Sequence, residues 1–179
     1  MNATQTIHEN HLCEKESKWF AVHTRFKSEK MALKYLTSNE IIAYLPIKNL
    51  SRKYGNRVRA IEMPLISSCV FVKIKKTEYL KVLETPYTAG FFKIGKNLLS
   101  VKDKEIELIQ KLIGENFEVE VERKEYLSGD IVEINAGPLM GLQGKLITFN
   151  GKQKVAVELM HSEFYLKINI ELSLLKKIG

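Results

Sequence analysis

Few side chains in this sequence are of the types that carry out catalysis, and they are scattered. The 179 residues include only two Asp, Asp103 and Asp130, and four His. The sequence has no P-loop, no Gly-x-Ser-x-Gly motif and no carboxylate pair beside a base. The main enzymatic alternative, a nuclease, is disfavoured because Asp is so scarce. We therefore expect a binding protein rather than an enzyme.

Residues that could bind a metal are equally sparse. His8 and His11 lie in a polar N-terminal stretch without a second ligand cluster, and neither Cys13 nor Cys69 belongs to a Cys-x-x-Cys pair. We expect no metal and no cofactor. No export signal and no apolar run of membrane-spanning length is present, so the expected location is the cytoplasm, with reduced thiols and no membrane contact.

Positive charge is the strongest chemical feature of the chain. The net charge is +7, and residues 18–59 alone hold 10 basic and 2 acidic residues. A local excess of this kind suits a polyphosphate partner, because each Lys or Arg that meets a phosphate releases condensed counterions. A solvated basic surface is the alternative, and charge alone does not decide between the two.

The elements that must position these charges alternate between strands and helices. Aromatic and β-branched runs predict strands, and apolar residues at helical spacing predict helices. We expect strands at 19–24, 41–45, 69–74 and 91–94, helices at 25–38 (with Ser28 as its N-cap), 77–84 and 101–113, and a hairpin of 47–53 and 57–63 around Tyr54-Gly55-Asn56. This order predicts an α+β fold, a sandwich of helices on a mostly antiparallel sheet.

Composition changes twice along the chain. Residues 1–17 are polar and aperiodic and predict a disordered tail, which leaves 18–114 as the first domain. Residues 115–127 hold five acids and predict a linker, although the alternating Phe117, Val119 and Val121 also fit an edge strand. Residues 128–179 combine regularly placed glycines with strands at 131–134, 145–149, 155–159 and 164–168, and Asn150-Gly151 predicts a hairpin turn. This pattern predicts a small SH3-like β-barrel.

Two sets of motifs resemble the NusG family of transcription elongation factors. The first resembles its N-terminal NGN domain and comprises Lys18–Thr24 followed by a basic helix, Tyr44-Leu45-Pro46, Pro64-Leu65 before Val70-Phe71-Val72, and Thr85-Pro86 before Phe91-Phe92. The second is similar to the KOW motif and comprises Gly129–Ile134, Gly137-Pro138-Leu139, Gly141 and Gly144. Together they cover residues 18 to about 177.

Departures from the family pattern point to a specialised member. Ile66-Ser67-Ser68-Cys69 stands where the family commonly has Phe-Pro-Gly-Tyr, and Tyr87 stands where many members have Gly. The Tyr44-Leu45-Pro46 strand and the basic hairpin resemble the UpxY-type antiterminators of polysaccharide loci.

The resemblance implies a transcription elongation or antitermination factor. Such a protein binds the clamp region of RNA polymerase and the non-template DNA strand, and thereby suppresses pausing or termination. Its KOW barrel recruits a second partner, ribosomal protein NusE or Rho, and we expect the chain itself to be a monomer. The alternative is a KOW-containing ribosome- or RNA-binding protein.

The resemblance also assigns residues to each contact. The polymerase-binding residues would be His23, Ile66, Cys69, Phe71 and Ile94, although Ile66 and Phe71 fit an ordinary core equally well. The DNA-binding residues would be Arg25, Lys27 and Lys30 at the first helix and Arg52, Lys53, Arg57 and Arg59 on the hairpin, with Phe26 and Tyr54 placed to stack on bases. Met160 would contact the partner of the barrel, unless it belongs to the barrel core.

Overall fold

The computed structural model describes residues 8–115, 117–123, 129–149, 152–158 and 164–178. The chain forms two compact units, Met1–Gln110 and Lys111–Gly179. The boundary between the units falls after Gln110, whereas the sequence places the end of the first domain at residue 114. None of the helices in the described ranges is long and apolar enough to span a membrane.

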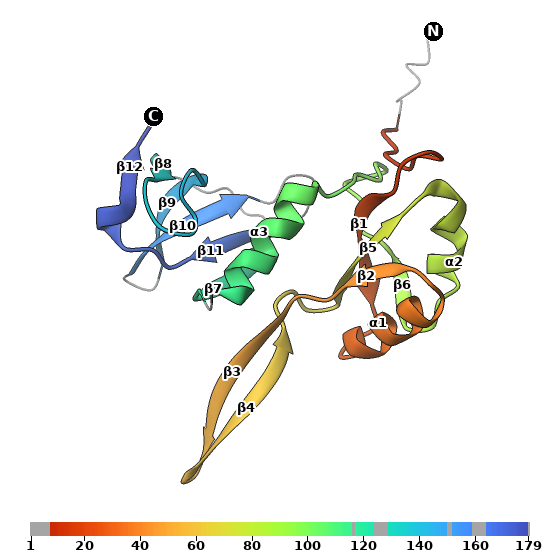
Figure 1. Cartoon of the computed structure of the whole chain (residues 1–179), viewed down its shortest axis with the longest axis horizontal. Coiled ribbons are helices and arrows are strands. Elements are labelled where there is room, and N and C mark those ends of the chain that lie inside the picture. Colours follow the sequence, from red (N-terminus) through yellow and green to blue (C-terminus); the bar gives the residue numbers. More distant parts are fainter. Residues whose placement is uncertain (1–7, 116, 124–128, 150–151, 159–163, 179) are drawn as a thin grey trace, which may run out of the picture. The chain divides into compact units, whose positions relative to one another are not determined.

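A four-stranded antiparallel sheet organises the first unit. Its order is β2-β5-β1-β6, and the strands are β1 (Lys18–Thr24), β2 (Ile42–Tyr44), β5 (Cys69–Ile74) and β6 (Thr88–Phe91) (Figure 1). In the central pair Phe20 lies opposite Val72, and Val22 opposite Val70. The predicted antiparallel sheet is therefore confirmed, with its most apolar strands at the centre.

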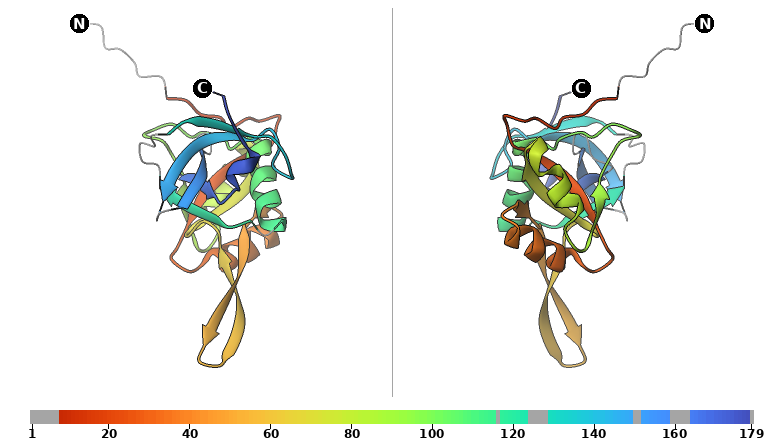
Figure 2. Two further views of the ribbon diagram at one scale, coloured as in Figure 1. Left: turned by 90° about the vertical axis from the view of Figure 1, so that its left-hand side faces the viewer. Right: turned by 90° about the vertical axis from the view of Figure 1, so that its right-hand side faces the viewer.

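Two helices pack on one face of this sheet, α1 (Glu29–Ser38) and α2 (Tyr79–Leu83), the latter preceded by the 3-10 turn η1 (Lys76–Glu78) (Figure 2). Alternation along the strands directs Phe20, Val72 and their neighbours to that face. There they join Leu36 of α1 and Val82 of α2 in one buried cluster. The helices thus close the core that the sequence pattern predicts.

The third helix, α3 (Asp103–Gly114), is amphipathic as predicted. Ile106, Ile109 and Leu112 recur at helical spacing and are buried. Near its start the Asp103 carboxylate pairs with Lys73 of β5 at 2.9 Å. One of the two Asp of the chain is therefore used in a surface ion pair.

Local backbone geometry sets two element boundaries. Helix α1 begins at Glu29 with Ser28 at its N-cap position, as predicted. The rest of the segment expected at 25–38 is a turn, because Lys27 has a φ of 55° and the Ser28 N–H donates to the Arg25 carbonyl. The strand expected at 91–94 is β6 at Thr88–Phe91. Beyond it Ile94 and Asn97 exchange backbone hydrogen bonds around Gly95, and this turn prevents a strand there.

Part of the predicted tail is ordered. The Leu98 N–H donates to the Glu9 carbonyl and the His11 N–H donates to the Leu98 carbonyl, both at 2.9 Å. The Ser100 N–H donates to His11 Nδ1 at 3.0 Å, and Leu12 packs against the core. The prediction of a disordered tail is wrong for residues 9–12, because their backbone groups find partners nearly ninety residues away.

The predicted hairpin is confirmed as a separate two-stranded sheet. It consists of β3 (Ile47–Tyr54) and β4 (Arg57–Pro64), whose pairing runs without a break from Ile47 opposite Pro64 to Tyr54 opposite Arg57. Gly55 turns the chain with a φ of 60°, and the Leu65 N–H donates to the Pro46 carbonyl at the base. The ribbon projects beyond the four-stranded sheet (Figure 1).

The second unit contains a six-stranded antiparallel sheet of order β12-β8-β9-β10-β11-β7. Its strands are β7 (Val119–Arg123), β8 (Ile131–Ile134), β9 (Gln143–Phe149), β10 (Lys152–Glu158), β11 (Phe164–Ile168) and β12 (Leu175–Lys177), the last preceded by the 3-10 turn η2 (Leu172–Leu174). Val132, Val155 and Leu166 are buried. Within the described residues β7 and β12 are the edges of this sheet, and no closed barrel is formed. The structure therefore supports an antiparallel sheet in this unit but not the predicted barrel. The Asn150-Gly151 turn lies outside the described residues.

Strand β7 corrects the predicted linker. It lies within residues 115–127 and pairs with β11, with Val119 opposite Ile168 and Val121 opposite Leu166. Val119 is buried, so the alternation in this acidic segment reflects a real edge strand. Position 129, just before β8, requires glycine, because a Cβ there would collide with the Leu146 carbonyl oxygen of β9.

Candidate functional site

The turn between β1 and α1 presents a cluster of cationic and aromatic side chains. Arg25, Phe26 and Lys27 are all exposed, and Phe26 is 77% exposed. Lys27 Nζ lies 5.2 Å from the centre of the Phe26 ring. Because residues 25–28 turn rather than continue the helix, these neighbouring side chains can all reach solvent. We call residues 25–27 the turn surface.

Two tyrosines adjoin the turn surface. The Arg25 N–H donates to the Tyr87 carbonyl at 2.9 Å, and the Tyr87 ring lies 5.6 Å from that of Tyr35 on α1. Tyr87 has a φ of 70°, a conformation that favours glycine. Rings and cations side by side suit single-stranded nucleic acid, whose bases stack and whose phosphates are anionic.

Glu29 stabilises the first turn of α1 from inside the protein. Its side chain is 7% exposed, and Oε1 accepts the Ser68 N–H at 2.7 Å. Ser68 has a φ of 54°, and its carbonyl accepts the Thr24 N–H at 3.0 Å. Glu29 therefore holds the loop before β5 against the end of β1.

Lys30, predicted to bind DNA, is engaged elsewhere. Its Nζ lies 2.7 Å from Oε2 of Glu62 on β4. Lys30 lowers the pKa of Glu62 by donating a hydrogen bond and by its charge. The pair joins α1 to the hairpin, so Lys30 is not part of the turn surface.

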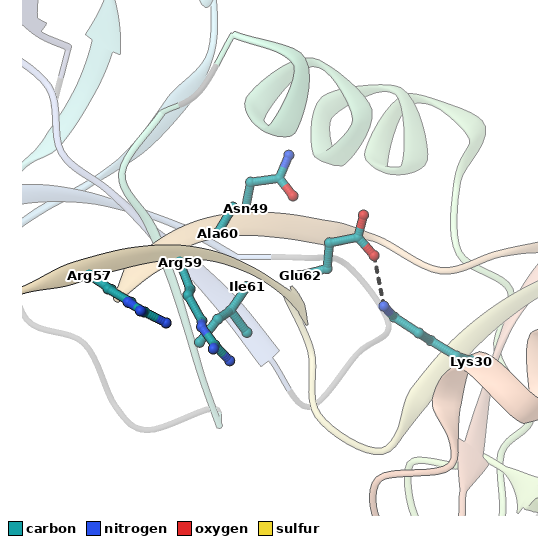
Figure 3. Close-up of a pocket in the computed structure, with 7 residues that line it drawn as sticks. All are labelled: Lys30, Asn49, Arg57, Arg59, Ala60, Ile61 and Glu62. Carbon is teal, nitrogen blue, oxygen red and sulfur yellow. Dashed lines mark hydrogen bonds and ion pairs between the residues drawn. The ribbon is translucent and has the colours of Figure 1, made fainter. Parts of the chain in front are cut away.

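The hairpin forms a groove of about 1040 Å³ beside the start of α1 (Figure 3). It is lined by Lys30, Asn49, Arg57, Arg59, Ala60, Ile61 and Glu62. Lys53, Arg57 and Arg59 are exposed, and Arg52 lies opposite Arg59 in the strand register. The structure thus places the predicted hairpin cations on one ribbon, separate in sequence from the turn surface.

The residues expected to contact polymerase do not form one exposed patch. Ile66, Cys69 and Phe71 are only 2%, 1% and 2% exposed, so they act as core residues in this conformation. Burial raises the pKa of the Cys69 thiol. His23 is half-buried and stacks on Phe92 at 3.4 Å, whereas Ile94 is 40% exposed. The sequence had left this choice open for Ile66 and Phe71, and the structure favours the core.

The second unit offers a different surface from the one expected. Met160 lies outside the described residues. Met140, in the turn around Gly137 and Gly141, is 71% exposed and was missed from the sequence. An apolar residue inside a glycine-rich turn has little core to join, and this signal was available from the sequence.

Possible catalytic and metal-binding groups stay dispersed in the described part of the chain. Asp103 pairs with Lys73, and Asp130 pairs with Lys177 at 3.0 Å. No three His, Cys, Asp or Glu side chains among the described residues gather as metal ligands.

Comparison with known proteins points to one family. Residues 17–110 match the NusG family, described as transcription termination factor nusG. The chain is similar to a solved structure entitled "Domain interaction in Thermotoga maritima NusG", with 22% identity, a TM-score of 0.56, and coverage of 92% of this chain and 98% of that one. Two conformations of an MjSpt4:Spt5 complex match with 18% identity, cover 90% of this chain and 98% and 97% of theirs, and have TM-scores of 0.31 and 0.29. No curated protein matches.

Proposed function

Since this chain belongs to the NusG family, whose members are transcription factors rather than enzymes, we propose that it binds RNA polymerase and the non-template DNA strand to suppress pausing or termination. The family match spans more than half of the sequence and includes every element that positions the turn surface. A ligand that binds the elongating form of polymerase more tightly than the paused form shifts the population towards elongation without any bond being made.

The observation that carries this proposal is the turn surface itself. Arg25 and Lys27 supply charge for phosphates, and Phe26 exposes most of a ring beside them. The non-template strand of an open transcription complex is single-stranded, and a stacked base contributes about 1–3 kcal/mol on a platform of this kind. Arg25 and Lys27 of the predicted site lie on the turn surface, and Lys30, which pairs with Glu62 in the free protein, remains a proposed DNA contact.

For the polymerase contact we propose His23 with its stacked partner Phe92, together with the exposed Ile94. Ile66, Cys69 and Phe71 would support this surface from within. We also propose a specialised paralogue of the UpxY type, supported by the Ile66–Cys69 departure from the aromatic family pattern.

For the second unit we propose a KOW barrel that recruits NusE or Rho. Its regularly paired strands and the glycine that Leu146 requires at position 129 support this assignment. Met160 remains the proposed contact, with the exposed Met140 as a second one.

A transcription assay with purified polymerase tests the proposal. The tagged chain should retain polymerase subunits and shorten pauses, and Phe26→Ala should weaken the effect about fivefold or more, as the loss of one stacked base predicts. Tyr79→Phe, away from the turn surface and conservative in shape, serves as the control. Retention of ribosomal RNA in place of polymerase subunits would favour the RNA-binding alternative.

A further inference from the structure

Hairpin β3–β4 carries its arginines on one face. Residues directly opposite in an antiparallel ribbon share a face, and alternate residues along a strand change face. One face comprises the pairs Leu50–Ile61, Arg52–Arg59 and Tyr54–Arg57, and we call it the arginine face. The opposite face comprises Asn49–Glu62, Ser51–Ala60 and Lys53–Val58. Figure 3 shows Arg57, Arg59 and Ile61 on one side of the ribbon and Asn49 and Glu62 on the other.

The two faces differ in net charge. These pairs place three arginines and no acid on the arginine face, against one lysine and one glutamate on the opposite face. The glutamate, Glu62, already pairs with Lys30 of α1. The positive charge of the ribbon is therefore concentrated on one face. A hairpin whose cations served only to keep it solvated would not need this arrangement.

This sorting is unfavourable for the free hairpin. Arg52 and Arg59 are directly opposite in the register, and like charges in that position destabilise a strand pair. The ribbon is also a two-stranded sheet of its own, a structure that is marginal in water without support. A polyanion laid along the arginine face would relieve the repulsion, so the arrangement fits a ligand better than it fits stability.

We propose that the arginine face binds B-form duplex DNA, with the ribbon lying in the major groove. The major groove, about 12 Å wide, admits a two-stranded β-ribbon, and the arginine fork matches both phosphates and the edge of guanine. The eight-residue strands reach far enough to follow the groove. The major groove of an RNA duplex is too deep and narrow for such a ribbon. This inference rests on the proposed function in transcription and separates a duplex site from the single-strand site at residues 25–27.

Binding by the full chain tests the face as well as the ligand. Arg59→Thr and Lys53→Thr each remove one exposed cation from the same hairpin, but from opposite faces, and threonine suits a strand. Fluorescence anisotropy would compare duplex DNA of two helical turns, the RNA duplex of the same sequence, and the single DNA strand. We expect Arg59→Thr to weaken duplex-DNA binding roughly tenfold and to lower the salt slope by about 1, with Lys53→Thr within about twofold of the unaltered protein.

Arg57→Thr should reproduce the Arg59→Thr result, and matched thermal unfolding of all variants would show that each is folded. Equal losses from Lys53→Thr and Arg59→Thr would overturn the proposal, as would equal losses on single-stranded DNA or on the RNA duplex. Loss of binding to DNA-free polymerase with unchanged duplex binding would also overturn it, because the ribbon would then be a protein contact. Failure of the full chain to retain polymerase, with face-dependent duplex binding intact, would contradict the proposed function alone.

Discussion

The four-stranded sheet and hairpin β3–β4 lie in the same unit and are both antiparallel, yet their side chains serve opposite purposes. Strand β5 is buried at five of its six positions, whereas β4 has no buried position in its eight. Burial makes the sheet a source of stability, because each apolar side chain removed from water contributes. Exposure leaves the hairpin side chains available to a ligand. Substitutions should therefore affect stability in one region and binding in the other.

The largest effect of burial in the sheet should be on chemical access to the thiol of Cys69 in β5, compared with that of Cys13 before β1. The pKa of Cys13 is lowered because the backbone N–H groups of Glu16 and Lys15 donate to its sulfur, whereas burial raises the pKa of Cys69. Cys69 can react only when β5 opens, and global opening at typical stabilities is on the order of a thousandfold or more unfavourable. Timed alkylation at pH 7.5, followed by mass spectrometry, should label Cys13 first by that margin. Comparable rates would mean that β5 is not the closed core described here.

The next largest difference should be in stability, when one apolar side chain is truncated in the four-stranded sheet and one in the hairpin. Phe20 is fully buried and meets Phe91 edge to face at 6.1 Å, so Phe20→Ala should cost about 3–5 kcal/mol of unfolding free energy. Val58 on the hairpin is 67% exposed, and Val58→Ala should change stability by less than about 0.5 kcal/mol. Urea unfolding measures both. Similar costs would contradict the division between a stabilising sheet and a binding hairpin.

A smaller loss should follow from Glu29, which joins α1 to the loop before β5. Glu29→Ala leaves the half-buried Ser68 N–H without its 2.7 Å acceptor, at a cost of about 1–3 kcal/mol. Glu29→Gln keeps an acceptor oxygen and should lose clearly less. An equal loss from both variants would point to the charge of Glu29, rather than its hydrogen bond, as the stabilising feature.

Alkaline pH should weaken the sheet more gently. Burial raises the pKa of Tyr44 to about 12 and that of Cys69 further, so the folded state keeps both groups neutral. The stability that these groups contribute is present at neutral pH and is lost as pH rises above their unfolded values, about 8.5 for Cys and 10 for Tyr. Urea unfolding at pH 7 and 10.5 should show the decrease, and Cys69→Ala with Tyr44→Phe should reduce it. A pH profile unaffected by both substitutions would assign the decrease to other groups.

The smallest effect on stability should come from the Lys30–Glu62 ion pair, which joins α1 to the hairpin. Lys30 and Glu62 are both more than half exposed, so solvent and salt screen their attraction. Lys30→Ala and Glu62→Gln should each leave the melting temperature almost unchanged. Because the folded-state pKa of Glu62 is lowered, its small contribution is present at neutral pH and disappears as pH falls through the carboxylate range. A large loss of stability in either variant would mean that the hairpin is held by this pair.

Local patterns were sufficient for much of the fold. Runs of aromatic and β-branched residues located β1 and β5, and Tyr54-Gly55-Asn56 between two polar strands located the hairpin turn. The positive charge of the turn surface and hairpin was equally visible, since it depends on residue type alone. The start of α1 was visible too, because Ser28 is a typical N-cap residue. The positive φ at Lys27 in the turn before it was not, because the helical spacing of apolar residues conceals that turn.

The sequence by itself determined which residues alternate, where the chain can turn and where positive charge collects, because each of these depends on neighbours a few positions away. Only the tertiary structure decided which residues those elements would meet. Lys30 pairs with Glu62, thirty-two residues away, and Glu9 and His11 form backbone hydrogen bonds with Leu98, nearly ninety residues away. The apolar side chains of Ile66 and Phe71 suited a surface or a core equally, and burial alone separated the two. Pairing and burial join distant segments, and their energies depend on the partner as much as on the residue itself.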